Sequence, residues 1–277
     1  MIDLHIHIIP GVDDGSRDMD LSLEMAAMAV DNGVRAVCAT PHFGFEGSAS
    51  RSQILAAYRE LEEELRIEQI PLTLALGMEI FATRKTPERL KKGEYWTLNH
   101  SRYYLIEFDF QTSASYIRDT LKKCEGSGLI PIIAHPARYA CVREDPQIAF
   151  DWISKGYGVQ LNRESILGYY GEDEEMTARE LLRHRCVTIV ATDAHGINYR
   201  PPLAAELTDY LHMAYGEEYT YLLTEENPGR ILRNQPLVGY EPIPFRDEGM
   251  PDEDEYPEER EEWLSDEDGY PAERQYQ

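Results

Sequence analysis

The sequence contains few of the residues and patterns on which several protein classes depend. Only four cysteines occur among its 277 residues, and no two of them form a Cys-x-x-Cys pair. They are Cys38, Cys124, Cys141 and Cys186. Scattered cysteines of this kind favour reduced thiols in a cytosolic protein over a disulfide framework or a thiolate zinc site. No apolar run approaches the roughly 18 residues of a membrane-spanning helix, so we expect no membrane insertion.

Basic residues are also scarce. The chain has 27 Lys and Arg against 51 Asp and Glu, which gives a formal net charge of −24. Nucleic-acid binding depends on Lys and Arg that neutralise phosphates, and anionic membranes attract basic surfaces, so neither is an expected partner. The first residues include no basic region of a targeting signal, so we expect a cytoplasmic protein. A hydrophobic fraction of 42% is enough for a globular core.

Short apolar runs alternate with amphipathic segments along most of the chain. Seven runs are predicted strands: Ile2–Ile6, Val34–Ala39, Leu72–Met78, Tyr103–Phe108, Leu129–Ala134, Gly158–Leu161 and Val187–Ala191. Five segments are predicted helices: Asp20–Asn32, Ser50–Glu68, Ser115–Glu125, Pro146–Lys155 and Glu174–His184. Such alternation predicts an α/β fold with parallel strands and crossover helices. Seven strands fit a barrel, although an open doubly wound sheet would give the same pattern.

Two segments depart from this alternation. Residues 79–102 are polar, and we expect them to form an excursion, such as a hairpin, over one end of the fold. Residues 247–277 contain 14 acidic and two basic residues, which account for half of the net charge. This composition predicts a disordered tail, so we divide the chain into a globular unit, 1–246, and an acidic tail, 247–277.

Histidines and carboxylates gather at the ends of the predicted strands. They are His5, His7, His42, His135 and His195, with Asp14, Glu79, Glu107 and Asp193. The carboxyl ends of parallel barrel strands meet on one face, where active sites form. Residues two apart on a strand point to the same side, so His5 and His7 should share that face. The other histidines, His100, His184 and His212, lie on helical or polar segments, and we assign them no role.

These nine side chains predict a metal centre. A single histidine of this type is more commonly a hydrogen-bonded core or surface residue than a metal ligand. Nine donors at successive strand ends are too many to be explained as separate structural residues. Four carboxylates in a confined space stay ionised only when positive charge offsets them. The donor set is carboxylate-rich with imidazole and no thiolate, which suits Mn²⁺, Fe²⁺ or Zn²⁺ better than Mg²⁺.

The motifs that contain these residues resemble the polymerase-and-histidinol-phosphatase (PHP) superfamily. They are His5-x-His7 with Pro10-Gly11-x-Asp13-Asp14-Gly15, Thr40-Pro41-His42, Gly77-x-Glu79, His135-Pro136 and Asp193-Ala194-His195. Within this superfamily, the sequence is most similar to the bacterial manganese-dependent protein tyrosine phosphatases of capsule and exopolysaccharide gene clusters. The likeness covers most of the chain, and the acidic tail lies outside it.

The resemblance implies a distorted (β/α)7 TIM-like PHP barrel that holds three Mn²⁺ ions, with Fe²⁺, Zn²⁺ or Co²⁺ as other possibilities. The implied ligands are His5, His7, Glu79 and Asp193 for one ion, Glu79, Glu107 and His135 for a second, and Asp14, His42 and His195 for a third. It also implies that Arg138 and Arg200 bind the substrate phosphate. The planar, bidentate guanidinium suits that task.

The expected reaction is hydrolysis of phosphotyrosine by attack of a metal-bound hydroxide. Because a tyrosine phenolate leaves readily, little acid catalysis is needed; Asp193, Asp14 and the water network remain alternative proton donors. The chain lacks the Cys-x₅-Arg and Gly-x-Ser-x-Gly motifs of covalent catalysis. The expected substrate is a phosphotyrosine protein, such as the tail of a bacterial tyrosine kinase that controls capsule or exopolysaccharide synthesis.

Two other functions remain open from the sequence. One is a phosphatase for histidinol phosphate or another small molecule on the same scaffold, and the other is a non-catalytic phosphotyrosine-binding module. The tail carries Tyr256, Tyr270 and Tyr276 among carboxylates. It resembles segments that bacterial tyrosine kinases phosphorylate, which raises the hypothesis of a substrate or self-inhibitory segment. A solubilising tail is the simpler interpretation.

Overall fold

The computed structural model describes residues 1–44 and 48–245, and all strand pairs in this part of the chain are parallel. The strands are β1 (Ile2–Ile6), β2 (Ala36–Ala39), β3 (His42–Phe43), β4 (Thr73–Leu76), β5 (Glu79–Phe81), β6 (Tyr103–Glu107), β7 (Ile130–Ala134), β8 (Gly158–Asn162) and β9 (Ile189–Ala191). They form a three-stranded sheet in the order β1-β2-β4 and a six-stranded sheet in the order β3-β5-β6-β7-β8-β9. The predicted α/β fold with parallel strands is confirmed.

The described residues form nine strands where the sequence predicted seven, because two short strands, β3 and β5, follow the predicted runs Val34–Ala39 and Leu72–Met78. Strand β3 follows β2 after Pro41, a residue with no N–H to donate to a ladder. Strand β5 follows β4 after Gly77, where an added Cβ would lie 2.8 Å from the Leu98 side chain. Strands of two and three residues are too short for a periodic pattern to reveal them.

The two sheets are connected in two places. On one side, β2 continues into β3 and β4 into β5 along the chain, and a hydrogen bond from Gly77 N to Ala39 O at 2.9 Å extends the β2–β4 pairing toward the β3–β5 pair. On the other side, His7 N donates to Ala194 O at 2.9 Å and an isolated parallel bridge pairs Ile6 with Ala194. The strands of both sheets therefore direct their carboxyl ends to a common region.

The helices connect successive strands. They are α1 (Met19–Asp31), α2 (Arg51–Ile67), α3 (Thr86–Lys91), α4 (Ala114–Cys124), α5 (Ala140–Glu144), α6 (Gln147–Ser154), α7 (Arg163–Ile166), α8 (Glu172–Arg183), α9 (Ala204–Tyr215), α10 (Glu217–Tyr221) and α11 (Asn227–Leu232). Short 3-10 turns occur at η1 (Leu98–His100) and η2 (Pro136–Arg138), and a π turn, η3 (Leu222–Glu226), joins α10 to α11. All five predicted helices are present, with boundaries that shift by one or two residues.

The prediction of a hairpin in residues 79–102 was wrong. This segment contains strand β5, helix α3 and turn η1. Pro87 lies in the first turn of α3, where its fixed φ favours a helix and its missing N–H costs nothing. The predicted acidic tail, 247–277, lies outside the described residues.

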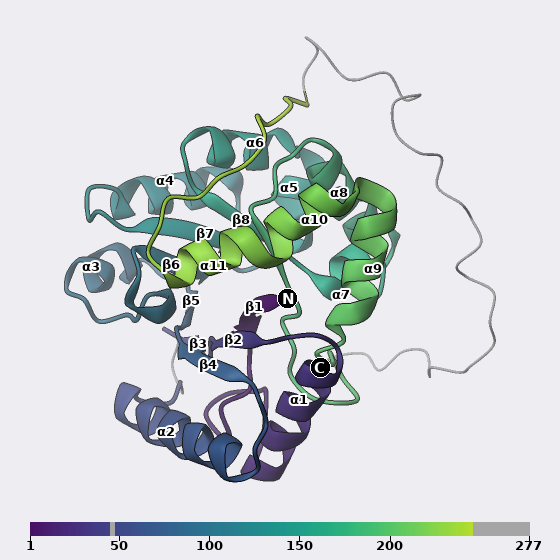
Figure 1. The fold of residues 1–277 in the computed structure, drawn as a ribbon. Helices are drawn as coiled ribbons and strands as arrows, with labels where there is room; N and C mark the ends of the chain where they lie inside the picture. The colour runs from purple at the N-terminus through teal and green to yellow at the C-terminus, as the bar shows by residue number, and fades with distance from the viewer. Residues whose placement is uncertain (45–47, 246–277) are drawn as a thin grey trace.

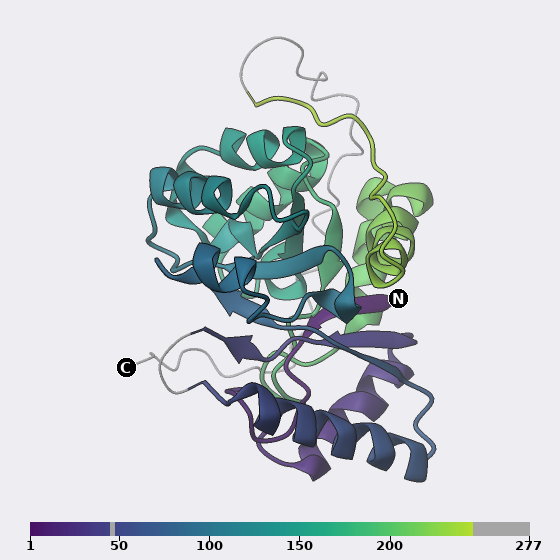
Figure 2. The same cartoon turned by 90° about the vertical axis from the view of Figure 1, so that its left-hand side faces the viewer.

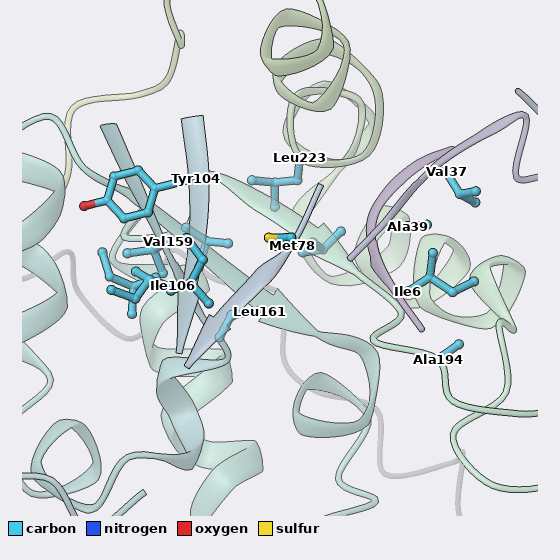
Figure 3. Close-up of a cluster of buried hydrophobic side chains, with 14 of the residues drawn as sticks. Ile6, Val37, Ala39, Met78, Tyr104, Ile106, Val159, Leu161, Ala194 and Leu223 are labelled. Atoms are coloured by element: carbon cyan, nitrogen blue, oxygen red, sulfur yellow. The ribbon is translucent and has the colours of Figure 1, made fainter. Parts of the chain in front are cut away.

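The helices cover the strands from different sides. Helices α1 and α2 lie side by side beneath β2 and β4, while α3 to α8 surround the six-stranded sheet (Figures 1 and 2). Figure 3 shows the buried cluster between strands and helices, in which Ile6, Val37 and Ile106 are fully buried. Within the part of the chain that the structure describes, no helix combines the length and the apolar character needed to cross a membrane.

Candidate metal and phosphate site

The strands bring all nine predicted metal ligands to one place. His5 lies on β1, His42 on β3, Glu79 on β5 and Glu107 at the end of β6; His7 and Asp14 follow β1, His135 follows β7, and Asp193 and His195 follow β9. Their donor atoms form overlapping groups within 4.8 Å. His135 joins them through direct contacts with two of the carboxylates. All but His42 and Asp14 are buried, and the Asp14 side chain is 67% exposed at the rim.

Glu79 is at the centre of the first group. Its Oε2 lies 3.1 Å from His5 Nε2 and 3.2 Å from His7 Nε2. The Nε2 atoms of these two histidines are themselves 3.2 Å apart. Asp193 Oδ1 lies 3.2 Å from His5 Nε2 and completes the group. These are the four residues that the resemblance implies for one ion.

The hydrogen bonds of the opposite ring nitrogens indicate what this group binds. His5 Nδ1 lies 3.0 Å from Gln160 Oε1, and His7 Nδ1 lies 2.7 Å from Asp13 Oδ2. Both partners are acceptors, so each Nδ1 carries a proton and each Nε2 is the ring nitrogen directed at Glu79. Histidines that are held at Nδ1 by an acceptor and aim Nε2 at a shared carboxylate have the arrangement of metal ligands.

The second group contains Glu79, Glu107 and two histidines. His135 Nε2 lies 3.0 Å from Glu79 Oε1 and 3.5 Å from Glu107 Oε2, as the implied ligand set requires. His42 Nδ1 also lies 3.0 Å from Glu79 Oε2 and 3.2 Å from Glu107 Oε1. His42 therefore borders this group as well as the third one.

The third group lies nearest to solvent. Asp14 Oδ1 is 3.4 Å from His42 Nε2 and 3.5 Å from His195 Nε2. His195 Nδ1 lies 2.8 Å from the backbone oxygen of Asp193, so its Nε2 presents a lone pair. The His7 ring lies 3.9 Å from that of His195, so the first and third groups are adjacent.

The pKa values of the side chains reflect this crowding. Burial opposes protonation of His42, but Glu79 outweighs it and raises the pKa of His42 to about 10. Burial also opposes ionisation of Glu79, yet His5 and His42 hold its pKa well below the usual range. For His195, burial and the neighbouring His7 lower the pKa to about 4. The carboxylates thus attract positive charge, which divalent ions can supply in place of protons.

The two predicted phosphate-binding arginines both lie at this site. Arg200 donates to Asp193 Oδ2, and its Nη1 lies 3.1 Å from His195 Nε2. Arg138, in η2, has its guanidinium carbon 4.0 Å from the centre of the Phe110 ring and 4.7 Å from that of Tyr170. The two arginines therefore approach the metal-ligand cluster from different loops.

Three of these residues have a left-handed backbone. The φ angles are 34° at His135, 54° at Asp193 and 50° at Arg200. Residues other than glycine adopt this conformation at a cost, and it is enriched at functional sites. The backbone at the ends of β7 and β9 is therefore bent where the ligands are needed.

The sequence analysis missed the residues that orient the histidines. Asp13 accepts from His7 and from the backbone N of His42, the latter at 3.0 Å. Gln160 Oε1 accepts from His5 and from the backbone N of His135. Asp13 lies within the motif that carries the resemblance, and Gln160 is a polar residue in an apolar strand; both signals were present in the sequence. His184, which we assigned no role, stacks on Phe245.

Comparisons with known proteins agree with this site. The family described as capsular polysaccharide synthesis, CpsB/CapC, matches residues 1–233. This chain belongs to that family. The tyrosine-protein phosphatase YwqE from Bacillus subtilis is 34% identical to this chain over 251 residues, covering 89% of this chain and 97% of YwqE. The tyrosine-protein phosphatase CpsB from Streptococcus pneumoniae is 32% identical, covering 85% of this chain and 99% of CpsB.

A solved structure supports the same assignment. It is one of the crystal structures of YwqE from Bacillus subtilis and CpsB from Streptococcus pneumoniae, which are described as metal-dependent tyrosine phosphatases. Its chain matches this chain with a TM-score of 0.83 and 33% identity, and the match covers 89% of this chain and all of the solved chain. The resemblance that the motifs indicated is thereby confirmed at the level of the CpsB/CapC family.

Proposed function

We propose that this CpsB/CapC family member is a metal-dependent protein tyrosine phosphatase. The observation that carries the proposal is the convergence of nine imidazole and carboxylate ligands with Arg138 and Arg200 in one site. Relatives that are more than 30% identical over nearly their whole length are named tyrosine-protein phosphatases. The same family description supports a role in capsule or exopolysaccharide synthesis.

The ligand set fits three divalent ions, for which we propose Mn²⁺, with Fe²⁺, Zn²⁺ or Co²⁺ as alternatives. The groups around Glu79, around Glu107 and around Asp14 would each hold one ion. When bound, divalent ions lower the pKa of water and offset the charge of the phosphoryl group. Asp13 and Gln160 hold His7 and His5 at Nδ1, so the Nε2 atoms of these histidines would be the ones to bind the ions.

The protein's own residues account for substrate binding. Arg138 and Arg200 would bind the non-bridging oxygens of the phosphoryl group through their planar guanidinium groups. Asp193 contacts both His5 and Arg200, so we assign it to positioning the histidine and the arginine. A tyrosine phenolate has a pKa of about 10, against roughly 16 for a serine alkoxide, so its departure needs little help from an acid.

Four further proposals concern the whole protein. The hydrogen bond and the bridge between the ends of β1 and β9, together with the continuity of the strands on the other side, support a single distorted (β/α)7 barrel made of the two sheets. Residues 1–246 would form this unit, with 247–277 as a separate tail. All four cysteines are free, which supports a reducing, cytoplasmic location. The proposed substrate is the phosphotyrosine-bearing tail of a bacterial tyrosine kinase.

Turnover of defined substrates tests the proposed function. The full chain would be assayed on a phosphotyrosine peptide, its phosphoserine counterpart and histidinol phosphate, first stripped of metal and then with Mn²⁺ restored. We expect Mn²⁺-dependent turnover that is largely confined to phosphotyrosine. The variant His5→Asn should lose this activity, whereas His212→Asn, which changes an exposed histidine on α9, should retain it.

The other outcomes separate the alternatives. Preference for histidinol phosphate would assign a small-molecule phosphatase to the same site. Tight binding of the phosphotyrosine peptide by the metal-loaded protein without turnover would identify a binding module. Either result would overturn the proposal.

A further inference from the structure

Tyr170 lies close enough to both arginines of the site to feel their charge, and it has no role in the functions described above. Its ring packs on the Arg138 guanidinium, 4.7 Å from ring centre to Cζ. The same guanidinium also packs on Phe110 at 4.0 Å. Arg138 is therefore in contact with two aromatic rings, which restrict a flexible side chain that would otherwise lose entropy when it binds a ligand.

The hydroxyl of Tyr170 is buried and has no hydrogen-bond partner in residues 1–44 and 48–245. The Nε atom of Arg200 is in the same condition. Buried donors without acceptors are costly, so two of them in one site indicate that an acceptor is missing. A phosphoryl group, which offers several anionic oxygens, is an acceptor of the required kind.

The nearby carboxylates do not serve as that acceptor. Asp193 and Glu164 both act electrostatically on Tyr170. However, Asp193 accepts from Arg200 through Oδ2, and Glu164 Oε1 lies 3.0 Å from Arg163 Nη1. The other oxygen of each carboxylate has no hydrogen-bond partner in the described residues, so neither of them reaches the Tyr170 hydroxyl. Burial raises the pKa of the Tyr170 phenol although Arg200 and Arg138 oppose the shift, so the hydroxyl keeps its proton and remains a donor.

We propose that Tyr170 is a substrate-binding residue in two ways: its ring orients the Arg138 guanidinium, and its hydroxyl donates a hydrogen bond to the phosphoryl group that the two arginines bind. This inference rests on the proposed function, because that function assigns the phosphate to Arg138 and Arg200. It adds a neutral donor and a packing surface to two charged groups. The stack of Phe110, Arg138 and Tyr170 then forms one wall of the phosphate site.

Matched variants separate the hydroxyl from the ring. Tyr170→Phe removes only the hydroxyl, Tyr170→Leu removes both, and Phe110→Leu removes the other ring. Tyr169→Phe is the control, because the neighbouring Tyr169 hydroxyl donates to Glu206, which pairs with Arg163. Each full-length protein would be loaded with Mn²⁺, freed of excess metal and titrated with inorganic phosphate. Metal content and thermal stability would be measured on the same samples.

The expected results differ between variants. Tyr170→Phe should weaken phosphate binding by about ten-fold, as for a lost hydrogen bond to a charged group. Tyr170→Leu should weaken it by a further factor of about three to ten, and Phe110→Leu by a similar factor, through loss of packing on Arg138. Tyr169→Phe should stay within about two-fold of wild type. Metal content should be unchanged in all of them.

Three results would overturn the inference. Phosphate affinity of Tyr170→Phe within about two-fold of wild type would remove the hydroxyl's role. Equal affinities of Tyr170→Phe and Tyr170→Leu would remove the ring's role. Loss of metal from Tyr170→Phe would show that the hydroxyl supports the metal centre and not phosphate binding. If wild type failed to hydrolyse phosphotyrosine, the proposed function would fail, and the phosphate titration would still decide the role of Tyr170.

Discussion

His7 Nδ1 lies 2.7 Å from Asp13 Oδ2, and this contact directs the other ring nitrogen of His7 toward Glu79. In the described residues, Asp13 does not belong to any group that could hold a metal ion, whereas His7 does. Asp13 nevertheless determines which nitrogen of His7 faces the other ligands. It also accepts from the backbone of Gly15 and of His42, so it links the loop after β1 to strand β3. One carboxylate therefore positions two histidines of the site.

Replacing Asp13 should weaken metal binding without removing a ligand. Asp13→Asn keeps the size of the side chain but loses the charge that holds the proton on His7 Nδ1. Loss of such a partner typically reduces metal affinity by about 10–100-fold. Titration of the metal-free protein with Mn²⁺ measures the change. Asp20→Asn, at an exposed position in the first turn of α1, is the control, and equal affinities for the two variants would contradict the assigned role.

Removing divalent metal should destabilise the protein. Without ions, the charge of the buried carboxylates of Glu79, Glu107 and Asp193 has to be offset by protons on the neighbouring histidines, which burial makes costly. At a free metal concentration of about 100 times the Kd, binding contributes about 2.7 kcal/mol. For a domain of this size, that corresponds to a Tm higher by roughly 5–10 °C.

Thermal unfolding with a chelator and with Mn²⁺ measures this effect. Glu79→Gln alters the carboxylate shared by the first two groups, and its Tm should respond much less to Mn²⁺. A wild-type Tm that is the same in both conditions would show that the cluster binds no metal with useful affinity.

The sequence predicted which histidines and carboxylates lie together because their positions follow from local rules. Residues at i and i+2 share one side of a strand, and parallel strands bring their carboxyl ends together, so His5, His7 and Asp193 could be grouped without coordinates. The predicted helix boundaries lie within two residues of the observed ones, and at α2 the Ser50 side chain caps the helix by accepting from Gln53 N. These features depend on neighbours in the chain.

The parts that the sequence did not predict depend on distant contacts. Leu98 approaches Gly77 so closely that a side chain there would collide with it, and Arg138 packs on Phe110 and Tyr170. The residue pattern around Arg138 does not show which aromatic rings from other segments will pack on it. The tautomers of His5 and His7 likewise required the positions of their partners in the folded protein.

Glu164 should make the stability of the metal-free protein depend on pH. Its side chain is buried, and burial raises its pKa from 4.5 to about 7 because the opposing attraction of Arg163 is weaker. The folded protein then binds a proton that the unfolded chain has released. The stabilisation is complete below the unfolded pKa, and it is lost as pH rises from about 4.5 to about 7.

Glu164→Gln removes this titration. Between pH 4.5 and 8, the free energy of unfolding of wild type should fall by roughly 1–3 kcal/mol more than that of the variant. Denaturant unfolding at several pH values, in the presence of a chelator, measures the difference. Glu172→Gln, at an exposed position in the first turn of α8, should follow wild type. Parallel curves for wild type and Glu164→Gln would refute the shifted pKa.

Arg200 should not be replaceable by lysine. Its two terminal nitrogens contact different residues, Nη2 with Asp193 and Nη1 with His195, so the planar fork spans two of the predicted ligands. A lysine ammonium keeps the charge but cannot reproduce this geometry. We expect Arg200→Lys to lower kcat/KM for the phosphotyrosine peptide by about 10–100-fold, which is the cost of one or two charge-assisted hydrogen bonds.

The comparison with Arg17→Lys distinguishes geometry from charge. Arg17 is exposed and pairs with Asp18 on the surface, so its replacement should leave kcat/KM within about two-fold of wild type. If Arg200→Lys also behaved like wild type, then charge alone would be sufficient at this position and the bidentate role would be wrong. If Arg200→Lys lost bound metal, the arginine would act by holding Asp193 in place, because that carboxylate is shared between the guanidinium and the first ligand group.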